Sequence, residues 1–147
     1  MPIELKVKTV QLWVLHDGDR KGLLADVLQP LVEAGAELRV VMAYRYPDQL
    51  DRAAIQVFPV DGRSAEAAAR GIGFAVSDTP CLLVEGEARR GLAARIAREI
   101  ADARVSMAFY TFETNGQKFW ALIGLDTEED AATVKKTVEA FARNFHR

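Results

Sequence analysis

The sequence predicts an α+β protein that is built from two copies of one β-α-β-β-α-β unit with antiparallel sheets. The segment from Asp19 to Leu38 recurs, in degraded form, from Glu87 to Met107. In each copy a polar loop with one glycine opens a helix, and an apolar strand follows the helix. Short stretches in which apolar and polar residues alternate are typical of half-buried strands. We therefore expect a first unit at residues 1–78 and a second unit at residues 79–147.

The repeated helices carry apolar residues at i, i+4 and i+8, which turns one face of each helix toward a core. These stripes are Leu23, Val27 and Leu31 in the first copy and Leu92, Ile96 and Ile100 in the second. The first helix is predicted from about Lys21 to Ala34, and its counterpart from Gly91 to Ala103. Two further helices are expected at residues 61–70 and from about Glu128 to near the end of the chain.

Strands are predicted wherever the alternation has a period of two. Residues 3–7 and 10–14 both alternate, but the two sets are out of phase across Lys8-Thr9, so either a bulge or a break between two strands is expected there. The remaining strands are predicted at 38–46, 52–60, 74–76, 81–84, 105–112 and 119–125. This assignment leaves the second copy one strand short and the first copy with one strand too many. We hypothesise that the amino-terminal strand fills the vacant position in the second sheet, in this chain or in a partner's.

The composition excludes several classes of function. Nineteen basic and 21 acidic residues are interspersed and give a net charge of −2, which provides no basic surface for nucleic acid. No run of apolar residues is long enough to span a membrane, and the amino terminus does not read as a secretory signal. We expect a cytoplasmic protein with no nucleic-acid or membrane partner. Cys81, the single cysteine, lies in an apolar run and is expected to be a buried, inert thiol.

Each repeated helix begins at a glycine, Gly22 or Gly91. The first turn of a helix has unpaired N–H groups and partial positive charge, and a glycine allows close approach by a ligand. A carboxylate could therefore lie on the N–H groups of Gly22 and Leu23, while an ammonium group pairs with Asp19 or Asp17. The alternative is that these carboxylates only form a turn and a helix cap.

The repeated unit resembles the tandem ACT-domain family. The likeness rests on the Gly-Leu pairs that start the helices, on Ala34-Gly35 after the first helix, and on the linker from Gly71 to Ser77. The resemblance implies ferredoxin-like units that bind an amino acid or similar effector where two units meet, near the loop between the first strand and the first helix. This chain keeps both glycines of that loop, but Lys21 and Arg90 stand where the family commonly has proline.

The resemblance and the loop chemistry together define the candidate ligand-binding residues. They are His16, Asp17, Asp19, Arg20, Gly22 and Leu23 at the first loop and Arg90, Gly91 and Leu92 at the second. No catalytic residue, cofactor or metal site is predicted, because His16 and His146 stand alone without the spaced partners that metals require.

The resemblance implies a regulatory sensor that binds an amino acid, performs no chemistry, forms a homodimer and acts allosterically on an enzyme or another protein partner. The aromatic residues on the predicted strands, Trp13 among them, are expected to pack in the cores and on the sheet faces. The alternative is a dimer face, for which Trp13 is the candidate because it stands opposite the predicted apolar face of residues 10–14. Two alternatives remain open. One is a structural interaction module whose ligand loops have decayed, and the other is a small ferredoxin-like enzyme that uses His16, Asp17 and Asp19.

Overall fold

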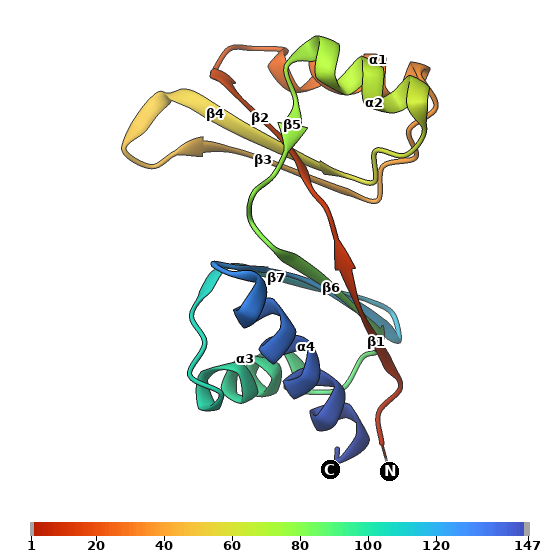
Figure 1. The fold of residues 1–147 in the computed structure, drawn as a ribbon, viewed down its shortest axis with the longest axis vertical. Helices are drawn as coiled ribbons and strands as arrows, with labels where there is room; N and C mark the ends of the chain where they lie inside the picture. Colours follow the sequence, from red (N-terminus) through yellow and green to blue (C-terminus); the bar gives the residue numbers. More distant parts are fainter. Residues whose placement is uncertain (1, 146–147) are drawn as a thin grey trace. The chain divides into compact units, whose positions relative to one another are not determined.

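The computed structural model of the chain describes residues 2–145, which form two compact units, each with a four-stranded antiparallel sheet and two helices (Figure 1). One unit comprises Gln11–Asp78, and the other combines the chain before Gln11 with the chain from Thr79 onward. The predicted tandem α+β fold is confirmed. The units expected from the sequence, residues 1–78 and 79–147, differ from these in one respect: they place the residues up to Val10 with the first repeat.

The unit Gln11–Asp78 has the predicted β-α-β-β-α-β order. Its elements are β2 (Trp13–Gly18), α1 (Leu23–Glu33), β3 (Val40–Tyr46), β4 (Gln49–Phe58), α2 (Arg63–Ile72) and β5 (Ala75–Val76). The strands are arranged in the order β3-β4-β2-β5, so that β3 and β5 form the edges of the sheet. Both helices cover the same face of this sheet (Figure 1).

The other unit repeats this plan with one strand taken from the amino terminus. Its elements are β1 (Leu5–Val10), β6 (Cys81–Glu87), α3 (Leu92–Asp102), β7 (Met107–Asn115), β8 (Lys118–Leu125) and α4 (Glu128–Arg143), with the strand order β1-β6-β8-β7. Strand β1 pairs antiparallel with β6, with Val7 opposite Val84. The amino-terminal strand therefore completes the second sheet within the same chain, as hypothesised.

The break between the first two strands lies at Gln11-Leu12, and not at Lys8-Thr9 as expected. Strand β1 runs through Lys8-Thr9 without interruption, and the change of phase arises because Val7 packs in the core beside the helices while Val10 does not. The alternating residues 10–14 therefore belong to two strands, because β1 ends at Val10 and β2 begins at Trp13.

The structure confirms core packing for Trp13 and contradicts the alternative of a dimer face. Its side chain is only 4% exposed and belongs to the core of its unit, where the guanidinium of Arg70 lies 4.9 Å from the centre of the ring. Trp13 therefore faces the helices and is not available as a dimer face.

The predicted helix stripes form the cores. The residues buried on α1 are Leu23, Val27 and Leu31, and those on α3 are Leu92, Ile96 and Ile100. The α1 stripe packs with apolar side chains of β2 and β4, and the α3 stripe with those of β6 and β8. Each fully buried Leu or Ile contributes about 1.5–3 kcal/mol relative to exposure. The stripes are thus the main stabilising feature of each unit.

The glycine at the start of each repeated helix has a left-handed backbone conformation. Gly22 has φ 83° and Gly91 has φ 75°, and neither position has a side-chain cap. The Gly22 carbonyl oxygen accepts a hydrogen bond from the Asp26 N–H, which begins the helix. A residue with a Cβ is strained in this conformation, so the fold itself requires glycine at both positions.

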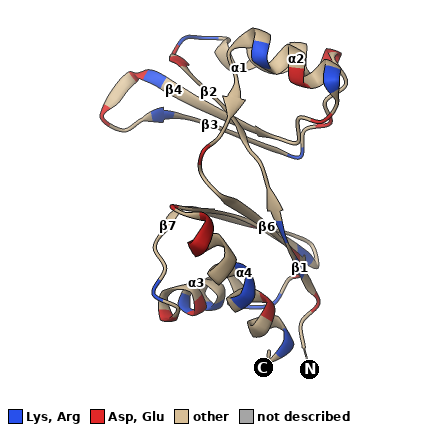
Figure 2. Cartoon of the chain, in the orientation of Figure 1, with Lys and Arg blue, Asp and Glu red and all other residues tan. Residues whose placement is uncertain are grey.

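Charged side chains of both signs are distributed over each unit (Figure 2). Within residues 2–145, none of the helices combines the length and apolar character needed to cross a bilayer.

Cys81 is buried at the start of β6, and burial raises the pKa of its thiol to about 12. Hydrogen bonds with the backbone of Ile123 and Leu82 lower the pKa, but by less than burial raises it.

Replacing Gly22 and Gly71 by alanine is expected to have opposite effects on stability. Gly22→Ala places a Cβ in the left-handed region and should lower the free energy of unfolding by about 1–2 kcal/mol. Gly71 lies within α2 with open space around it, so Gly71→Ala should raise that free energy by about 0.5–1 kcal/mol. Urea unfolding of both variants measures the difference, and equal effects would contradict the backbone conformation at Gly22.

The thiol of Cys81 is expected to resist modification in the folded protein. Because the folded-state pKa lies near 12, almost no thiolate is present at neutral pH, and burial also blocks access. Ellman's reagent should therefore react slowly with the native protein and rapidly with the same protein in urea. Equal rates in the two states would show that the thiol is exposed.

Candidate functional site

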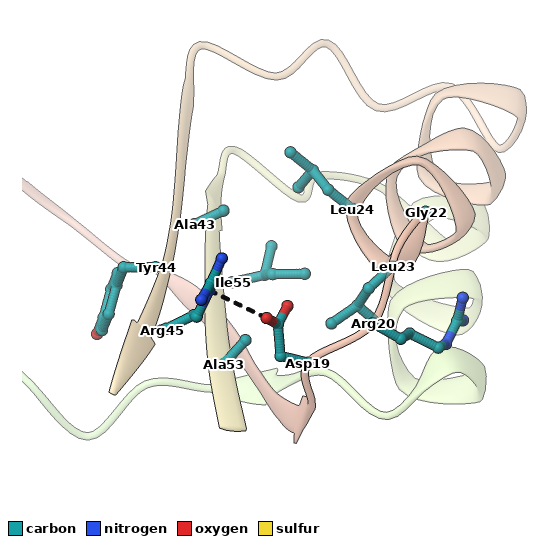
Figure 3. Close-up of a pocket in the computed structure, with 10 residues that line it drawn as sticks. All are labelled: Asp19, Arg20, Gly22, Leu23, Leu24, Ala43, Tyr44, Arg45, Ala53 and Ile55. Carbon is teal, nitrogen blue, oxygen red and sulfur yellow. Dashed lines mark ion pairs between the residues drawn. The ribbon is translucent and has the colours of Figure 1, made fainter. Parts of the chain in front are cut away.

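A cavity of about 310 Å³ lies in the unit Gln11–Asp78, between the start of α1 and strands β3 and β4 (Figure 3). Its volume is at the lower end of the range found for ligand pockets, which suits a small molecule. The lining residues are Asp19, Arg20, Gly22, Leu23, Leu24, Ala43, Tyr44, Arg45, Ala53 and Ile55. The cavity is therefore formed by the glycine loop predicted from the sequence together with the β3–β4 hairpin.

An ion pair between Asp19 and Arg45 spans the cavity. The Nε of Arg45, near the end of β3, lies 3.1 Å from a carboxylate oxygen of Asp19 (Figure 3). The backbone N–H of Asp19 donates to the carbonyl oxygen of Asp51 at 2.7 Å, which ties the loop to β4. The Arg45 side chain is 62% exposed and that of Asp19 is 32% exposed. Exposed pairs of this kind contribute at most about 1 kcal/mol, so either group can exchange its partner for a ligand at little cost.

Small and apolar side chains form the rest of the cavity wall. Ala43 and Arg45 share one face of β3, and they pair in register with Ile55 and Ala53 of β4. The two alanines leave the space in front of Ile55 empty. The ring of Tyr44 points away from the cavity (Figure 3), toward the other face of the sheet, where its hydroxyl accepts a hydrogen bond from Gln56.

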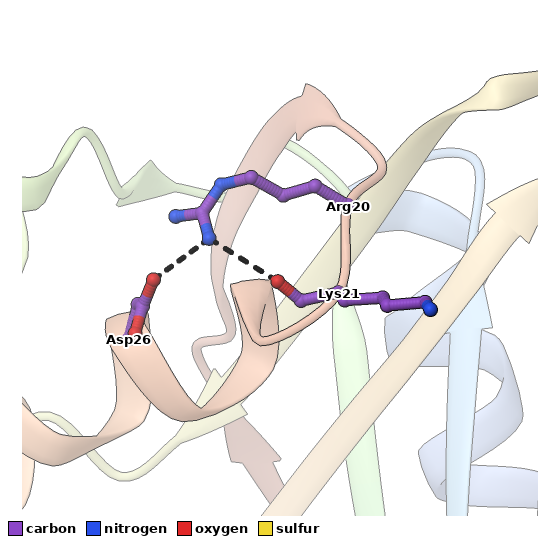
Figure 4. A network of polar contacts seen from close by, with 3 residues as sticks. All are labelled: Arg20, Lys21 and Asp26. Carbon is purple, nitrogen blue, oxygen red and sulfur yellow. Dashed lines mark hydrogen bonds and ion pairs between the residues drawn. The ribbon is translucent and has the colours of Figure 1, made fainter.

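Arg20 lies at the rim, over the first turn of α1. One guanidinium nitrogen lies 2.7 Å from a carboxylate oxygen of Asp26 and 3.5 Å from the carbonyl oxygen of Lys21 (Figure 4). The carbonyl oxygen of Arg20 accepts a hydrogen bond from the Leu23 N–H at 3.3 Å. The Leu23 N–H is therefore already bonded within the loop, and it is not the open anion ligand that the sequence predicted.

His16 and Asp17, which the sequence also assigned to the ligand site, do not line the cavity. The Nδ1 of His16 is hydrogen-bonded to the hydroxyl of Tyr46. The carboxylate of Asp17 accepts a hydrogen bond from the Gly18 N–H at 2.7 Å and so stabilises the local turn. For Asp17 the structure thus matches the turn alternative. Of the first-loop residues, Asp19, Arg20, Gly22 and Leu23 are the ones brought together at the cavity.

Six cavity residues were missed from the sequence: Leu24 of α1 and, on the β3–β4 hairpin, Ala43, Tyr44, Arg45, Ala53 and Ile55. The strands of the hairpin were predicted, but nothing in the sequence states which hairpin residues lie next to the glycine loop. A signal was available in Arg45, because it is a charged residue near the end of a predicted apolar strand.

The second loop is built differently. Arg90 and Gly91 are exposed, and Leu92 is buried in the core. The preceding residue, Arg89, forms an ion pair with Glu87 at 2.8 Å. Among residues 2–145, no group of three or more His, Cys, Asp or Glu side chains is placed to hold a metal ion, and His146 lies outside the described residues.

No protein-family profile matches the sequence, and no curated protein matches it. Solved structures do match its fold. Protein BT0572 from Bacteroides thetaiotaomicron has a TM-score of 0.73 at 14% identity, with 90% of each chain covered. The regulatory subunit of aspartate kinase from Thermus thermophilus, in its ligand-free form, has a TM-score of 0.60 at 16% identity, over 96% of this chain and 97% of that one.

The corresponding subunit from Thermus flavus has a TM-score of 0.59 at 17% identity, over 96% of this chain and 99% of that one. These likenesses extend over nearly the whole chain, through both units. The chain therefore has the fold of a tandem ACT-domain protein.

Proposed function

We propose that this chain is a regulatory module that binds a small zwitterion, an amino acid or a related metabolite, in the cavity beside α1. The observation that carries the proposal is the Asp19–Arg45 ion pair at an open cavity with an apolar wall. The carboxylate and the guanidinium match in charge the ammonium and carboxylate groups of an amino acid. The glycine loop and the hairpin would then hold the ligand from two sides.

The chemistry of the wall fits such a ligand. The ligand's ammonium group would bond to Asp19 and its carboxylate to Arg45, and each charge-assisted hydrogen bond contributes about 1.5–3 kcal/mol where the bound ligand shields it from water. The ligand's side chain would lie on Ala43, Ala53 and Ile55. Asp19 and Arg45 neutralise each other in the free protein. A ligand that carries both charges would pair with each of them, so that no charge is left unpaired.

The same arrangement supports a role without catalysis. The titratable side chains at the cavity belong to Asp19, Arg20 and Arg45, and they do not include a nucleophile with an adjacent general base. The enzyme alternative needed His16, Asp17 and Asp19 to act together. In the structure the first two bond to Tyr46 and to a turn. The fold shared with regulatory subunits of aspartate kinase supports a regulatory role, with an enzyme as one class of partner.

The proposal includes a homodimer. On α1, Leu24 is 39% exposed and Val32 is 58% exposed, and on the edge strand β3 Val41 is 42% exposed. An apolar helix flank beside an unpaired strand edge is a surface that proteins commonly cover with a partner. A second copy of the chain is the simplest partner, and a regulated enzyme is the other.

Amino-acid binding is expected to raise the melting temperature of the protein in a concentration-dependent way. The twenty common amino acids should be screened singly by thermal shift. Asp19→Asn and Arg45→Gln should each weaken binding of the best amino acid roughly ten- to a hundredfold, the equivalent of one charge-assisted bond. Asp17→Asn is the matched control and should bind like the wild type. Equal losses in all three variants would contradict the assignment, and no shift with any amino acid would contradict the proposal.

The dimer is expected to depend on the β3 edge. Light scattering coupled to size exclusion should give a dimer mass for the wild type and a monomer mass for Val41→Lys. Leu50→Lys changes another exposed apolar side chain, at the tip of the β3–β4 hairpin, and should leave the dimer intact. A monomeric wild type would show that the chain does not dimerise alone.

A further inference from the structure

The two units have the same backbone plan at the cavity, and strand register identifies the equivalent positions. Leu15 and Val84 each stand seven residues before the glycine that opens the helix. Leu15 pairs with Ile55, and Val84 pairs with Ala121. Ile55 in turn pairs with Ala43 of β3, and Ala121 pairs with Phe112 of β7. Ala43 and Phe112 therefore occupy equivalent positions.

The next register pair on the same face gives the other equivalences. In the unit Gln11–Asp78, Ala53 pairs with Arg45. In the other unit, Phe119 pairs with Thr114. Phe119 thus stands where the first unit has Ala53, and Thr114 stands where it has Arg45.

Two aromatic rings fill the second site. Phe112 and Phe119 stack with their ring centroids 5.1 Å apart and an angle of 9° between the rings, and Phe119 is only 3% exposed. Both pack against the core that contains Leu92, the residue equivalent to Leu23. The two rings therefore stand at the positions where the alanines of the first unit line a cavity of about 310 Å³.

The second site also lacks the charges of the first. Counted from the helix-opening glycine, Ala88 stands where the first unit has Asp19, and Thr114 replaces Arg45. Arg89, equivalent to Arg20, pairs with Glu87. Beside the site the hydroxyl of Tyr110 donates to the carbonyl oxygen of Ala93 on α3 at 2.8 Å, so that this ring also covers the start of the helix. The Asp19–Arg45 ion pair of the first site therefore has no counterpart at the equivalent positions Ala88 and Thr114.

We propose that the chain binds one ligand, at the first unit alone, and that Ala43 and Ala53 are the specificity-determining residues that keep its cavity open. The equivalent position of the second unit is occupied by the stacked rings of Phe112 and Phe119. The ligand class is a small zwitterion that fits as a whole in the cavity of about 310 Å³. This inference rests on the proposed function for the identity of the ligand, but the open and closed cavities are properties of the chain itself.

The cavities are tested without any ligand by reciprocal substitution. Ala53→Phe places a ring in empty space and should leave the melting temperature unchanged or raised. The neighbouring Ala54 is fully buried and points to the other face of β4, so Ala54→Phe is the matched control and should lower the melting temperature. Phe119→Ala should lower it as well, because it empties a filled core, and Phe119→Leu should lower it less.

Binding is tested by titration calorimetry with whichever of the twenty common amino acids gives the largest thermal shift. The expected stoichiometry is one per chain, with binding lost in Ala53→Phe and retained in Phe119→Leu. Two ligands per chain, or full binding in Ala53→Phe, would overturn the inference. If none of the amino acids binds the wild type, the proposed function fails, and the stability comparison alone decides the inference. Equal destabilisation by Ala53→Phe and Ala54→Phe then overturns it.

Discussion

The packing of one apolar helix stripe against one face of a sheet determines the rest of each unit. In the unit Gln11–Asp78, Leu23, Val27 and Leu31 fix α1 over β2 and β4, so the loop before the helix must pass the end of β3. The stripe provides several kcal/mol of stabilisation, since each buried residue contributes about 1.5–3 kcal/mol. The exposed Asp19–Arg45 pair contributes far less. The charged groups at the cavity are therefore free to serve a ligand without affecting the fold.

The two units show how a duplicated site can diverge while its framework is retained. The glycines and the following leucines are the same in both units, and the helix stripes occupy equivalent positions. The left-handed glycine before each helix and the core beneath it depend on these residues. The strand positions that face the space beside the helix are not constrained in this way. Alanines there leave a cavity, while phenylalanines extend the core. The stacked phenylalanines of the second unit bury aromatic area, which stabilises that unit.

Much of the fold could be predicted from the sequence, because it depends on local periodicity. The repeat and both helix stripes followed from spacing. The strand donated by the amino terminus followed from the count of strands in the two copies, which left open whether this chain or a partner donates it. The break between β1 and β2 was misplaced, because β1 carries apolar residues on both faces and its alternation does not reveal where it ends. At the site, Asp19, Arg20 and Gly22 were found because they are close in sequence. Ala43 and Arg45 were missed because their proximity depends on the register of a hairpin, which local patterns do not fix.

The position of β1 in the sheet of the second repeat has a consequence for folding. Strand β1, near the amino terminus, pairs with β6, and the unit Gln11–Asp78 lies between the two strands in the sequence. Within that segment β2 and β5 are neighbours, and the Ser77 N–H donates to the carbonyl oxygen of Leu12 at 2.8 Å. Once this inserted unit has folded, its two ends lie side by side, so the entropy cost of joining β1 to β6 becomes that of a short connection. Folding of the unit Gln11–Asp78 thus favours formation of the sheet β1-β6-β8-β7, because it brings the chain ends that lead to β1 and β6 close together.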